Sequence, residues 1–306
     1  MRTVTDLNLL STVDTVVALG CFDGVHMGHR EVIRTAKAQA IRLGLPLAVL
    51  TFAQPPKNYF IPHSVPLLTD SKTKESLIEK LGVDLFLCVP FDQTVADMPS
   101  EEFFFEILIR RMRAAHIVCG FNYSFGAGGR GNADLLGNLA AKNNIGLSIL
   151  SPVTIDGIPV SSSAIRSAIG DGRVEEATLL LGRPYTLCAS VIDGQKLARS
   201  LGFPTLNQRF PKDVVVPRHG VYAVQVTTED GGTVLDGIAN VGVRPTVGGD
   251  EVWSETHIFN FDGDLYGKRV SVAFRSFLRP ERKFNSLDAL REQIQKDILL
   301  AKELLS

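Results

Sequence analysis

The hydrophobic period of this chain changes near residue 185. Before that point, apolar runs such as TVVAL (15–19) alternate with longer segments whose apolar residues recur every three or four positions, such as REVIRTAKAQAIRLG (30–44). After it, the runs are short, rich in β-branched residues and separated by Gly, Pro and Asp turns, as around GVYAVQVTT (220–228). Strand–helix alternation predicts a parallel sheet covered by helices, whereas short strands with close turns predict an antiparallel barrel or sandwich. The sequence therefore predicts two domains, 1–184 and 185–306.

The same patterns predict the remaining elements. In the first half, helices are expected at 71–82, 100–112, 132–144 and 161–172, and strands at 45–52, 84–91, 115–121 and 146–153. In the second half, strands are expected at 186–193, 233–242, 255–261 and 268–279. A final helix is expected at 286–305, with the face that packs on the strands formed by Leu287, Leu290, Ile294, Ile298 and Leu299.

Composition narrows the class of partner. The 306 residues include 32 Lys and Arg and 33 Asp and Glu, so the net charge of −1 creates no bulk field for nucleic acid or anionic membranes. No stretch reaches the roughly 18 apolar residues of a membrane span, and Asp6 and Asp14 interrupt any signal-peptide-like run. We expect a cytoplasmic protein that binds no nucleic acid and no membrane. The cysteines are widely spaced and are expected to be reduced thiols: Cys21, Cys88, Cys119 and Cys188.

The motif with the most chemistry is GCFDGVHMGH (20–29), which lies between a strand and a helix expected to begin at Gly28 or His29. Backbone N–H groups at a helix start lack partners and attract phosphate. Gly20 and Gly24 permit a tight turn and close approach of a ligand. The imidazoles of His26 and His29 can donate hydrogen bonds to a polyphosphate as charge builds up in a transition state. A lone His-x-x-His is more often incidental, but this order of residues at the carboxyl end of a strand favours an anion site.

This stretch resembles the H-x-G-H signature of nucleotidyltransferases that move AMP or CMP onto a phosphate. More narrowly, it resembles the G-x-F-D-G-x-H-x-G-H motif of the bacterial bifunctional riboflavin kinase/FMN adenylyltransferase (FAD synthetase) family, whose other signatures are matched by SSSAIR (161–166) and GFNYSFG (120–126). The resemblance implies a Rossmann-like α/β domain with parallel strands that adenylylates FMN. The residues that it assigns there are catalytic His26, His29 and Arg166, nucleotide-binding Gly20, Phe22, Asp23, Gly24, Gly28, Ser161, Ser162 and Ser163, and flavin-binding Asn122, Tyr123 and Phe125.

Two of these segments have other interpretations. SSSAIR alone is typical of a helix N-cap, although its hydroxyls and Arg166 can also hold an outgoing pyrophosphate. GAGGRG (126–131) matches the G-x-G-x-x-G dinucleotide fingerprint literally. However, it does not directly follow a strand, so a glycine loop beside the nucleotide or flavin site is favoured over NAD binding.

The second half has its own resemblance, to the riboflavin kinase barrel. LGFPTLN (201–207) is similar to that family's G-F-P-T-x-N, and GVYAV, NVGVRPT, ETHIFNFDGDLYG and FLRPERKF are similar to its other motifs. The resemblance implies an antiparallel β-barrel with a terminal helix, Thr205 and Asn207 as Mg²⁺ and nucleotide ligands, Gly202 as a nucleotide contact and Arg279 as a flavin contact. It also implies that Glu255 is the base that accepts the proton of the ribityl 5′-hydroxyl. Without the resemblance, Glu255 would be interpreted as a solvent-facing strand residue, and His257 on the same face as structural.

The resemblance covers about residues 15 to 300 with four departures. Residues 52–56 read FAQPP where the family often has F-E-P-H-P, Cys21 replaces a frequent Asn, Ala198 a usual Gly, and Ser163 a Thr. The implied protein uses ATP as co-substrate with Mg²⁺, acts on riboflavin and FMN, and is a monomer or weak homo-oligomer. The alternatives are a chain active chiefly as the kinase and a non-catalytic flavin-binding regulator. An H-x-G-H transferase for pantetheine or nicotinate phosphates leaves the second half unexplained.

Overall fold

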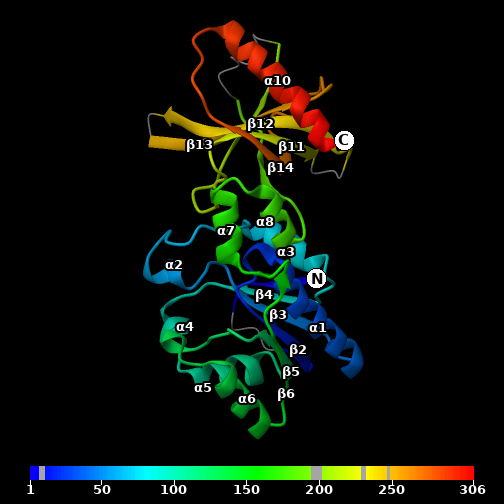
Figure 1. Ribbon diagram of the computed structural model, residues 1–306. Coiled ribbons are helices and arrows are strands. Elements are labelled where there is room, and N and C mark those ends of the chain that lie inside the picture. The colour runs from blue at the N-terminus through cyan, green and yellow to red at the C-terminus, as the bar shows by residue number, and fades with distance from the viewer. Residues whose placement is uncertain (7–10, 194–201, 229–231, 247–248) are drawn as a thin grey trace. The chain divides into compact units, whose positions relative to one another are not determined.

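The computed structural model describes residues 1–6, 11–193, 202–228, 232–246 and 249–306, so Ala198 lies outside the described residues. The chain divides into two compact units, Met1–Ser162 and Ser163–Ser306 (Figure 1). Each unit contains one six-stranded sheet, and the first also has a small two-stranded one. The two predicted sheet types are both present and are described in turn.

The sheet of the first unit is parallel, with the strand order β1-β4-β3-β2-β5-β6. Its strands are β1 (Arg2–Val4), β2 (Thr15–Leu19), β3 (Leu47–Phe52), β4 (Leu85–Val89), β5 (Ala114–Gly120) and β6 (Gly146–Leu150). From β2 the chain continues through β3 to β4 on one side, whereas β5 lies on the other side of β2 and leads to β6. The direction therefore switches between β2 and β5, whose carboxyl ends form the usual ligand position of such a sheet.

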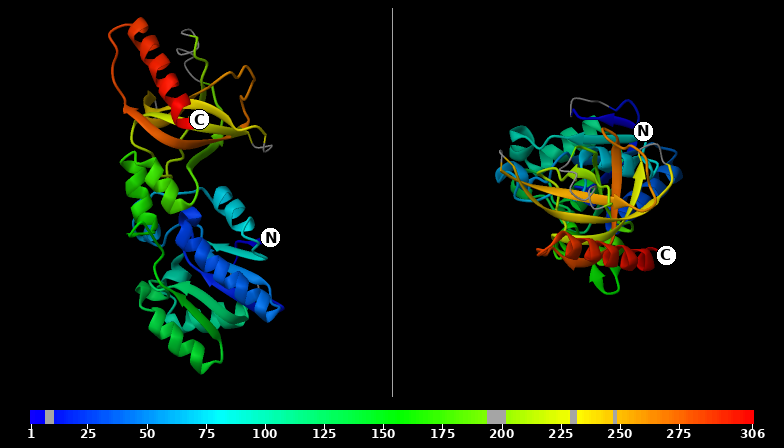
Figure 2. Two further views of the ribbon diagram at one scale, coloured as in Figure 1. Left: turned by 45° about the vertical axis from the view of Figure 1, so that its right-hand side comes forward. Right: turned by 90° about the horizontal axis from the view of Figure 1, so that it is seen from above.

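Helices cover both faces of this sheet (Figures 1 and 2). One face packs against α1 (Met27–Leu43) and α3 (Ser71–Glu79), and the other against a π-helix (Phe103–Arg111) and α6 (Ala133–Lys142). All five residues of β2 are buried, as expected for a strand covered on both sides. The shorter elements are η1 (Asp23–Val25), α2 (Lys57–Phe60), α4 (Gln93–Asp97), α5 (Ser100–Glu102), η3 (Ala127–Gly129), β7 (Thr154–Ile155) and β8 (Ile158–Pro159).

The sheet of the second unit is antiparallel, with the strand order β10-β13-β12-β11-β14-β9. Its strands are β9 (Tyr185–Ser190), β10 (Leu206–Arg209), β11 (Gly220–Thr228), β12 (Leu235–Thr246), β13 (Gly249–Ile258) and β14 (Arg269–Pro280). The Ile192 N–H donates to the Asn207 carbonyl at 2.9 Å, which joins the two outer strands into a nearly closed barrel. The buried Gln208 amide donates to the carbonyls of Ala189 and Val270 and stabilises the same seam. The predicted barrel is confirmed.

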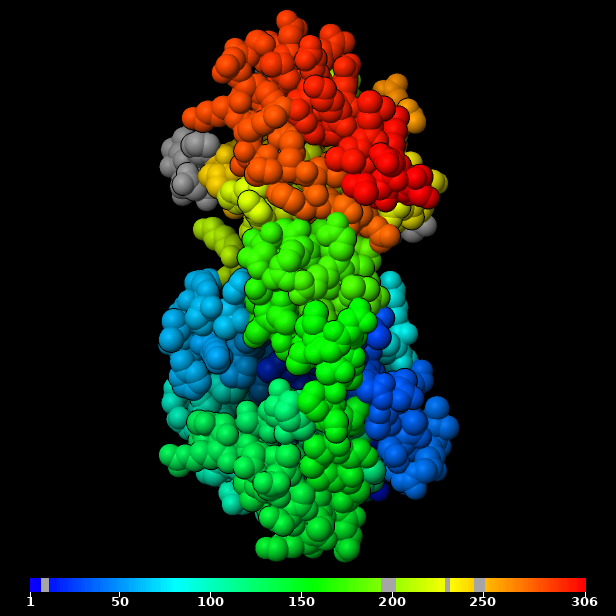
Figure 3. Space-filling model, viewed as in Figure 1, coloured from blue at the N-terminus to red at the C-terminus, as the bar shows by residue number. Residues whose placement is uncertain are grey.

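The terminal helix α10 (Leu287–Leu305) packs on β11, β12 and β14 of the barrel (Figures 2 and 3). The residues of its inner face are Ile294, Ile298, Ala301 and Leu305. The predicted face was wrong at two positions, because Leu287 and Leu299 are 56% and 68% exposed. The inner residues repeat every three or four positions, and Leu299 falls about 100° away from Ile298 around the helix axis.

Two further helices, α7 (Ser162–Gly170) and α8 (Val174–Leu181), pack with the second unit. The apolar side of α8 contacts β9 and β14, and the Arg218 N–H donates to the Ile169 carbonyl at the end of α7. The compact units consequently divide between residues 162 and 163. The boundary at 184/185 concerns the division of activities and stays a prediction.

Candidate active sites

The turn between β2 and α1 has an unusual backbone. Phe22, Gly24 and Val25 have φ values of 47°, 80° and 41°. Glycine adopts positive φ readily, but a bulky or β-branched residue does so only when its surroundings hold it there. Backbone strain of this kind clusters at ligand-binding and catalytic sites.

Buried hydrogen bonds from Asp23 and Gly24 hold the turn. The carboxylate of Asp23, which is 2% exposed, accepts the Leu68 N–H at 2.9 Å. The Gly24 N–H donates to the Thr69 hydroxyl at 3.3 Å, and the Ser162 hydroxyl donates to the Asp23 carbonyl at 3.1 Å. The carboxylate of Asp23 thus supports the turn from within, and any contribution of this residue to nucleotide binding would come from its backbone.

Phe22 and Gly20 also help to determine the conformation of the turn. The Phe22 ring is fully buried, and a Cβ on Gly20 would lie 3.1 Å from its Cζ atom. Because the ring fills the space that a side chain at position 20 needs, glycine is the residue that fits there. Both residues bring the backbone of the turn to the carboxyl end of β2.

His26 and His29 form one unit at the start of α1. His26 is the N-cap, and its Nδ1 atom accepts the His29 N–H at 3.2 Å. The two imidazoles stack with their centroids 3.5 Å apart and their planes at 14°. A Cβ on Gly28 would lie 3.2 Å from Cε1 of His26. The glycine between the histidines therefore leaves the space that the stacked arrangement needs, and the predicted helix start shifts to Met27.

His29 is a neutral imidazole at neutral pH. Burial, with smaller contributions from the charges of His26 and Lys74, lowers the pKa of His29 well below its ordinary value. Its Nδ1 atom is buried and has no hydrogen-bond partner among the described residues. Its ring also meets the edge of Phe22 at a centroid distance of 5.2 Å. A bound phosphate would oppose these effects, because a nearby negative charge favours the protonated form.

Lys74 is a residue of this site that the sequence patterns did not single out. It lies on α3 with 2% exposure, and its ammonium donates to the Phe52 carbonyl at the end of β3 at 3.0 Å. Its charge acts on His29. The one available signal is that Lys74 precedes the buried Ile78 by four residues, which places it on the inner face of the helix.

The loop after β5 reaches the other side of the switch point. Asn122 is exposed, and Tyr123 stacks on Phe125 at 5.9 Å and 15°. Phe125 is 5% exposed and belongs to the core, and burial raises the pKa of Tyr123. Of the aromatic residues in this loop, Phe121 is the one that faces outward, with 51% exposure.

The glycine-rich stretch 126–131 continues this loop. Phe125 pairs with Gly131, and the three-residue 3₁₀ turn η3 lies between them. No strand leads directly into a long helix in this described segment, so the dinucleotide fingerprint lacks its context.

The SSSAIR residues lie at the start of α7. Ser162 reaches the His-containing turn through its bond to Asp23. Ser161 precedes it, whereas Ser163 and Arg166 belong to the second compact unit, with Arg166 about one helical turn after Ser162. The structure thus joins Ser162 to the turn, and the role of Arg166 stays a prediction.

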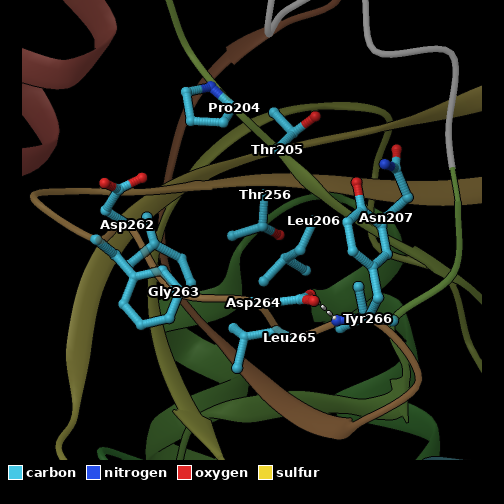
Figure 4. A pocket seen from close by; sticks show the side chains of 13 residues that line it. Pro204, Thr205, Leu206, Asn207, Thr256, Asp262, Gly263, Asp264, Leu265 and Tyr266 are labelled. Carbon is cyan, nitrogen blue, oxygen red and sulfur yellow. Dashed lines mark hydrogen bonds between the residues drawn. The ribbon is translucent and has the colours of Figure 1, made fainter.

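In the barrel, Thr205 and Asn207 line a cavity of about 360 Å³ (Figure 4). Asp262 and Asp264 lie at the same cavity, and Asp264 accepts the Tyr266 N–H at 2.9 Å. The described residues contain no group of three His, Cys, Asp or Glu that could hold a metal ion. The hydroxyl, amide and carboxylate oxygens at this cavity are of the kind that Mg²⁺ binds, but they can supply only part of its coordination shell. In nucleotide sites, phosphate oxygens complete that shell. Gly202, at φ 90°, has open space around a would-be Cβ.

A second cavity, of about 340 Å³, lies between the barrel and α10. Thr205 lines both cavities, so they adjoin. The charged and aromatic residues of the second cavity are Phe203, Glu255, His257, Arg279, Glu281, Arg282, Phe284 and Asp297. Arg279 donates to the buried Asp297 carboxylate at 2.8 Å, which ties the barrel to α10. His257 bonds through Nδ1 to the Pro204 carbonyl and so supports the stretch that carries Thr205.

Asn207 and Glu255 lie directly opposite each other on β10 and β13. The side-chain oxygens of both accept hydrogen bonds from Arg244 of β12, at 2.9 and 2.8 Å. Arg244 is part of NVGVRPT, yet sequence alone did not identify it as a site residue, because only the strand pairing shows that it meets these two.

The comparisons with known proteins agree with both units. A family model described as FAD synthetase matches residues 10–164, and one described as riboflavin kinase matches residues 181–305. Proteins named bifunctional riboflavin kinase/FMN adenylyltransferase are 36% identical in Pseudomonas fluorescens and 37% in Haemophilus influenzae, each covering 94% of this chain and 92% of the relative.

A crystal structure described as a macrolide-efflux protein from Streptococcus pneumoniae is also similar. It has 32% identity and a TM-score of 0.89, with 98% of each chain covered. Within the described residues of this chain, none of the helices has both the length and the apolar composition to cross a membrane. Two domain matches in the expected order and relatives that cover almost the whole length leave one assignment: the chain belongs to the bifunctional riboflavin kinase/FMN adenylyltransferase family, with a FAD synthetase domain followed by a riboflavin kinase domain.

Proposed function

We propose that this enzyme makes FAD from riboflavin in two ATP-dependent steps, one in each domain. Residues 185–306 convert riboflavin and ATP to FMN and ADP, and residues 1–184 convert FMN and ATP to FAD and pyrophosphate. The observation that carries the proposal is that one chain combines two chemically different arrangements: stacked imidazoles at the switch point of a parallel sheet, and a carboxylate that lines one of two adjoining cavities of a barrel.

In the first domain, an oxygen of the FMN phosphate attacks the α-phosphorus of ATP. The bond from that phosphorus to the α,β-bridging oxygen breaks, and pyrophosphate leaves. A phosphate monoester is already anionic at neutral pH, so no protein base is required. The N–H groups at the start of α1 and the imidazoles of His26 and His29 stabilise the charge of the pentavalent centre. Gly20, Gly24 and Gly28 permit the close approach of the triphosphate.

The remaining residues of the first site bind the leaving pyrophosphate and add positive charge to the site. Ser161, Ser162, Ser163 and Arg166 hold the pyrophosphate as it departs. Lys74 adds a positive charge near His29, which favours a polyanion there.

In the second domain, the 5′-hydroxyl oxygen of riboflavin attacks the γ-phosphorus of ATP. The bond to the β,γ-bridging oxygen breaks, ADP leaves, and the hydroxyl proton passes to the Glu255 carboxylate. Thr205 and Asn207 hold the nucleotide with Mg²⁺, and Gly202 allows the phosphates to approach the backbone. When bound, the cation neutralises phosphate charge.

The flavin ring would occupy the cavity beside Glu255. That cavity has the apolar faces of Phe203 and Phe284 and the cation of Arg279, a combination suited to a planar, partly polar ring system. In the first domain, flavin contact is assigned to Asn122, Tyr123 and Phe125. Because Phe125 is in the core, we expect its contribution to be the support of Tyr123.

The co-substrate, the cation, the compartment and the oligomeric state are part of the same proposal. ATP is the co-substrate of both steps, Mg²⁺ accompanies it, and the enzyme works in the cytoplasm as a monomer or weak homo-oligomer on small molecules alone.

The direct test is incubation of the purified chain with riboflavin and Mg-ATP, followed over time by chromatography. FMN should appear first and FAD afterwards, and supplied FMN should give FAD without riboflavin. FMN that accumulates without FAD would restrict the enzyme to the kinase step. Binding of riboflavin without ATP consumption would replace both activities by a regulatory role.

A further inference from the structure

Arg244 is a cation at the kinase site to which the reaction described above gives no role. Its guanidinium Nε donates to Oε1 of Glu255 at 2.8 Å, and Nη2 donates to Oδ1 of Asn207 at 2.9 Å. It thus bridges the proposed base and a proposed nucleotide ligand, which lie on different strands.

Strand geometry explains why one side chain reaches both. Asn240, Glu255 and Asn207 occupy directly opposed positions on β12, β13 and β10, so they point to the same face. Arg244 follows Asn240 by four residues on β12, and even spacing along a strand keeps it on that face. Its long side chain then lies along the face to the pair.

Trp253 limits the freedom of the Arg244 side chain. The guanidinium carbon lies 4.7 Å from the centroid of the Trp253 ring, and the ring is 8% exposed. A guanidinium that lies over an aromatic face and forks toward two oxygens has few alternative orientations. With 20% of the Arg244 side chain and 31% of the Glu255 side chain exposed, solvent screens this pair only in part.

We propose that Arg244 is a positioning residue for riboflavin phosphorylation, which fixes the carboxylate of Glu255 and the amide of Asn207 in the orientation that the reaction needs. The inference rests on the proposed function, since it presumes the roles of these two residues. Arg244 acts through them and takes no proton itself, because a guanidinium remains protonated throughout.

The decisive comparison is between Arg244→Met and Arg209→Met. Arg209 lies over the same Trp253 ring at 5.6 Å and pairs with Glu251 at 3.0 Å, but its described contacts do not include Glu255 or Asn207. Both variants remove an arginine from the same aromatic ring, and only one removes the bridge.

We expect Arg244→Met to lower kcat for FMN formation about ten- to hundredfold, because misplacing a reacting group by up to about 1 Å can cost that much. Arg244→Lys should restore kcat only in part, because an ammonium lacks the planar fork that reaches both oxygens.

Arg209→Met should stay within about twofold of the wild type. FAD formation from supplied FMN, measured in every sample, normalises the rates to the amount of enzyme, because that step takes place in the other domain. An unchanged kcat in Arg244→Met would overturn the inference, and so would an equal loss in Arg209→Met, which would assign the effect to packing around Trp253.

A double-mutant cycle separates this inference from the proposed function. If Arg244 acts through Glu255, then adding Arg244→Met to Glu255→Gln should cost much less than it costs the wild type. A Glu255→Gln variant with the wild-type kinase rate would remove the base itself. A fully additive double variant would leave the base in place and reject Arg244 as its positioning residue.

Discussion

The two sites of this enzyme are held by different means. At the switch point of the parallel sheet, backbone conformation and buried hydrogen bonds fix a pair of imidazoles, one of which is neutral. In the barrel, Arg244 donates hydrogen bonds to a carboxylate and an amide that belong to separate strands. The difference corresponds to the two acceptors. A phosphate monoester needs stabilisation of charge but no base, whereas a hydroxyl must lose a proton as it reacts.

The largest expected effect comes from Glu255→Gln. Loss of a general base costs about 10² to 10⁴ in rate, so FMN formation from riboflavin should nearly stop. FAD formation from supplied FMN should continue at the wild-type rate, because that step uses no base from the barrel. Chromatography of both reactions with the same enzyme preparation provides the measurement. A normal kinase rate would mean that the barrel does not activate the hydroxyl through Glu255.

His29→Ala is the reciprocal change. It removes one of the two imidazoles that we propose stabilise charge, and such losses typically cost about 10² to 10³ in rate. FMN should accumulate from riboflavin and ATP while FAD formation falls by that factor. His29 is preferable to His26 for this test, because His26 also caps α1 and its loss confounds catalysis with stability. FAD synthesis near the wild-type rate would refute the assignment of this turn.

A smaller effect is expected from Gly28→Ala, which tests whether the stacked imidazoles matter. The new Cβ would lie 3.2 Å from Cε1 of His26, so the ring must move by a few tenths of an ångström. We expect about a tenfold slower FAD formation, with a stability change below about 1 kcal/mol because alanine favours a helix.

The matched control for that variant is Gly137→Ala in α6. Its Cβ meets the Leu147 side chain at 3.8 Å, an ordinary contact. It should raise stability slightly and leave both rates unchanged. If Gly28→Ala proved equally silent, the exact stacking of the histidines would be irrelevant to the reaction.

The fold was predictable because each half repeats one period. The strand–helix alternation of the first half and the short, turn-bounded strands of the second are both present as expected. The exceptions depend on tertiary contacts. Strand β10 has four residues and gains its identity from pairing with β13, and the face of α10 is selected by the barrel. Neither is encoded in a local pattern.

The candidate sites follow from the sequence only as far as its motifs reach. The order of residues in GCFDGVHMGH located the two histidines, but not that His26 caps the helix or that Asp23 and Phe22 face inward. Lys74 and Arg244 were missed for the same reason. A cation on a helix or strand is usually solvated. Only the surrounding elements show that Lys74 is buried against the end of β3 and that Arg244 bridges two strands.

The smallest expected effect is on the pH dependence of the free energy of unfolding, which tests whether His29 is neutral in the folded chain. Because burial lowers the pKa of His29 in the folded chain, the unfolded chain takes up a proton near pH 6.5 while the folded imidazole does not. The unfolded state therefore binds more protons in that range, and the free energy of unfolding should fall as the pH decreases below about 6.5, by at most about 1.4 kcal/mol per unit. The stability is fully present above the ordinary pKa and declines until the folded pKa is reached.

His29→Gln isolates this contribution from those of the other histidines. Urea unfolding of the whole chain at about pH 7.5 and about pH 5.5, followed by helical circular dichroism, should show a smaller loss of stability in the variant than in the wild type. Circular dichroism is the suitable probe, since the single tryptophan, Trp253, lies in the barrel and reports on the other domain. Equal pH dependence in the two proteins would show that His29 is protonated as readily in the folded chain as in the unfolded chain. The first site would then not hold a neutral imidazole, and its contrast with the ion pair in the barrel would be wrong.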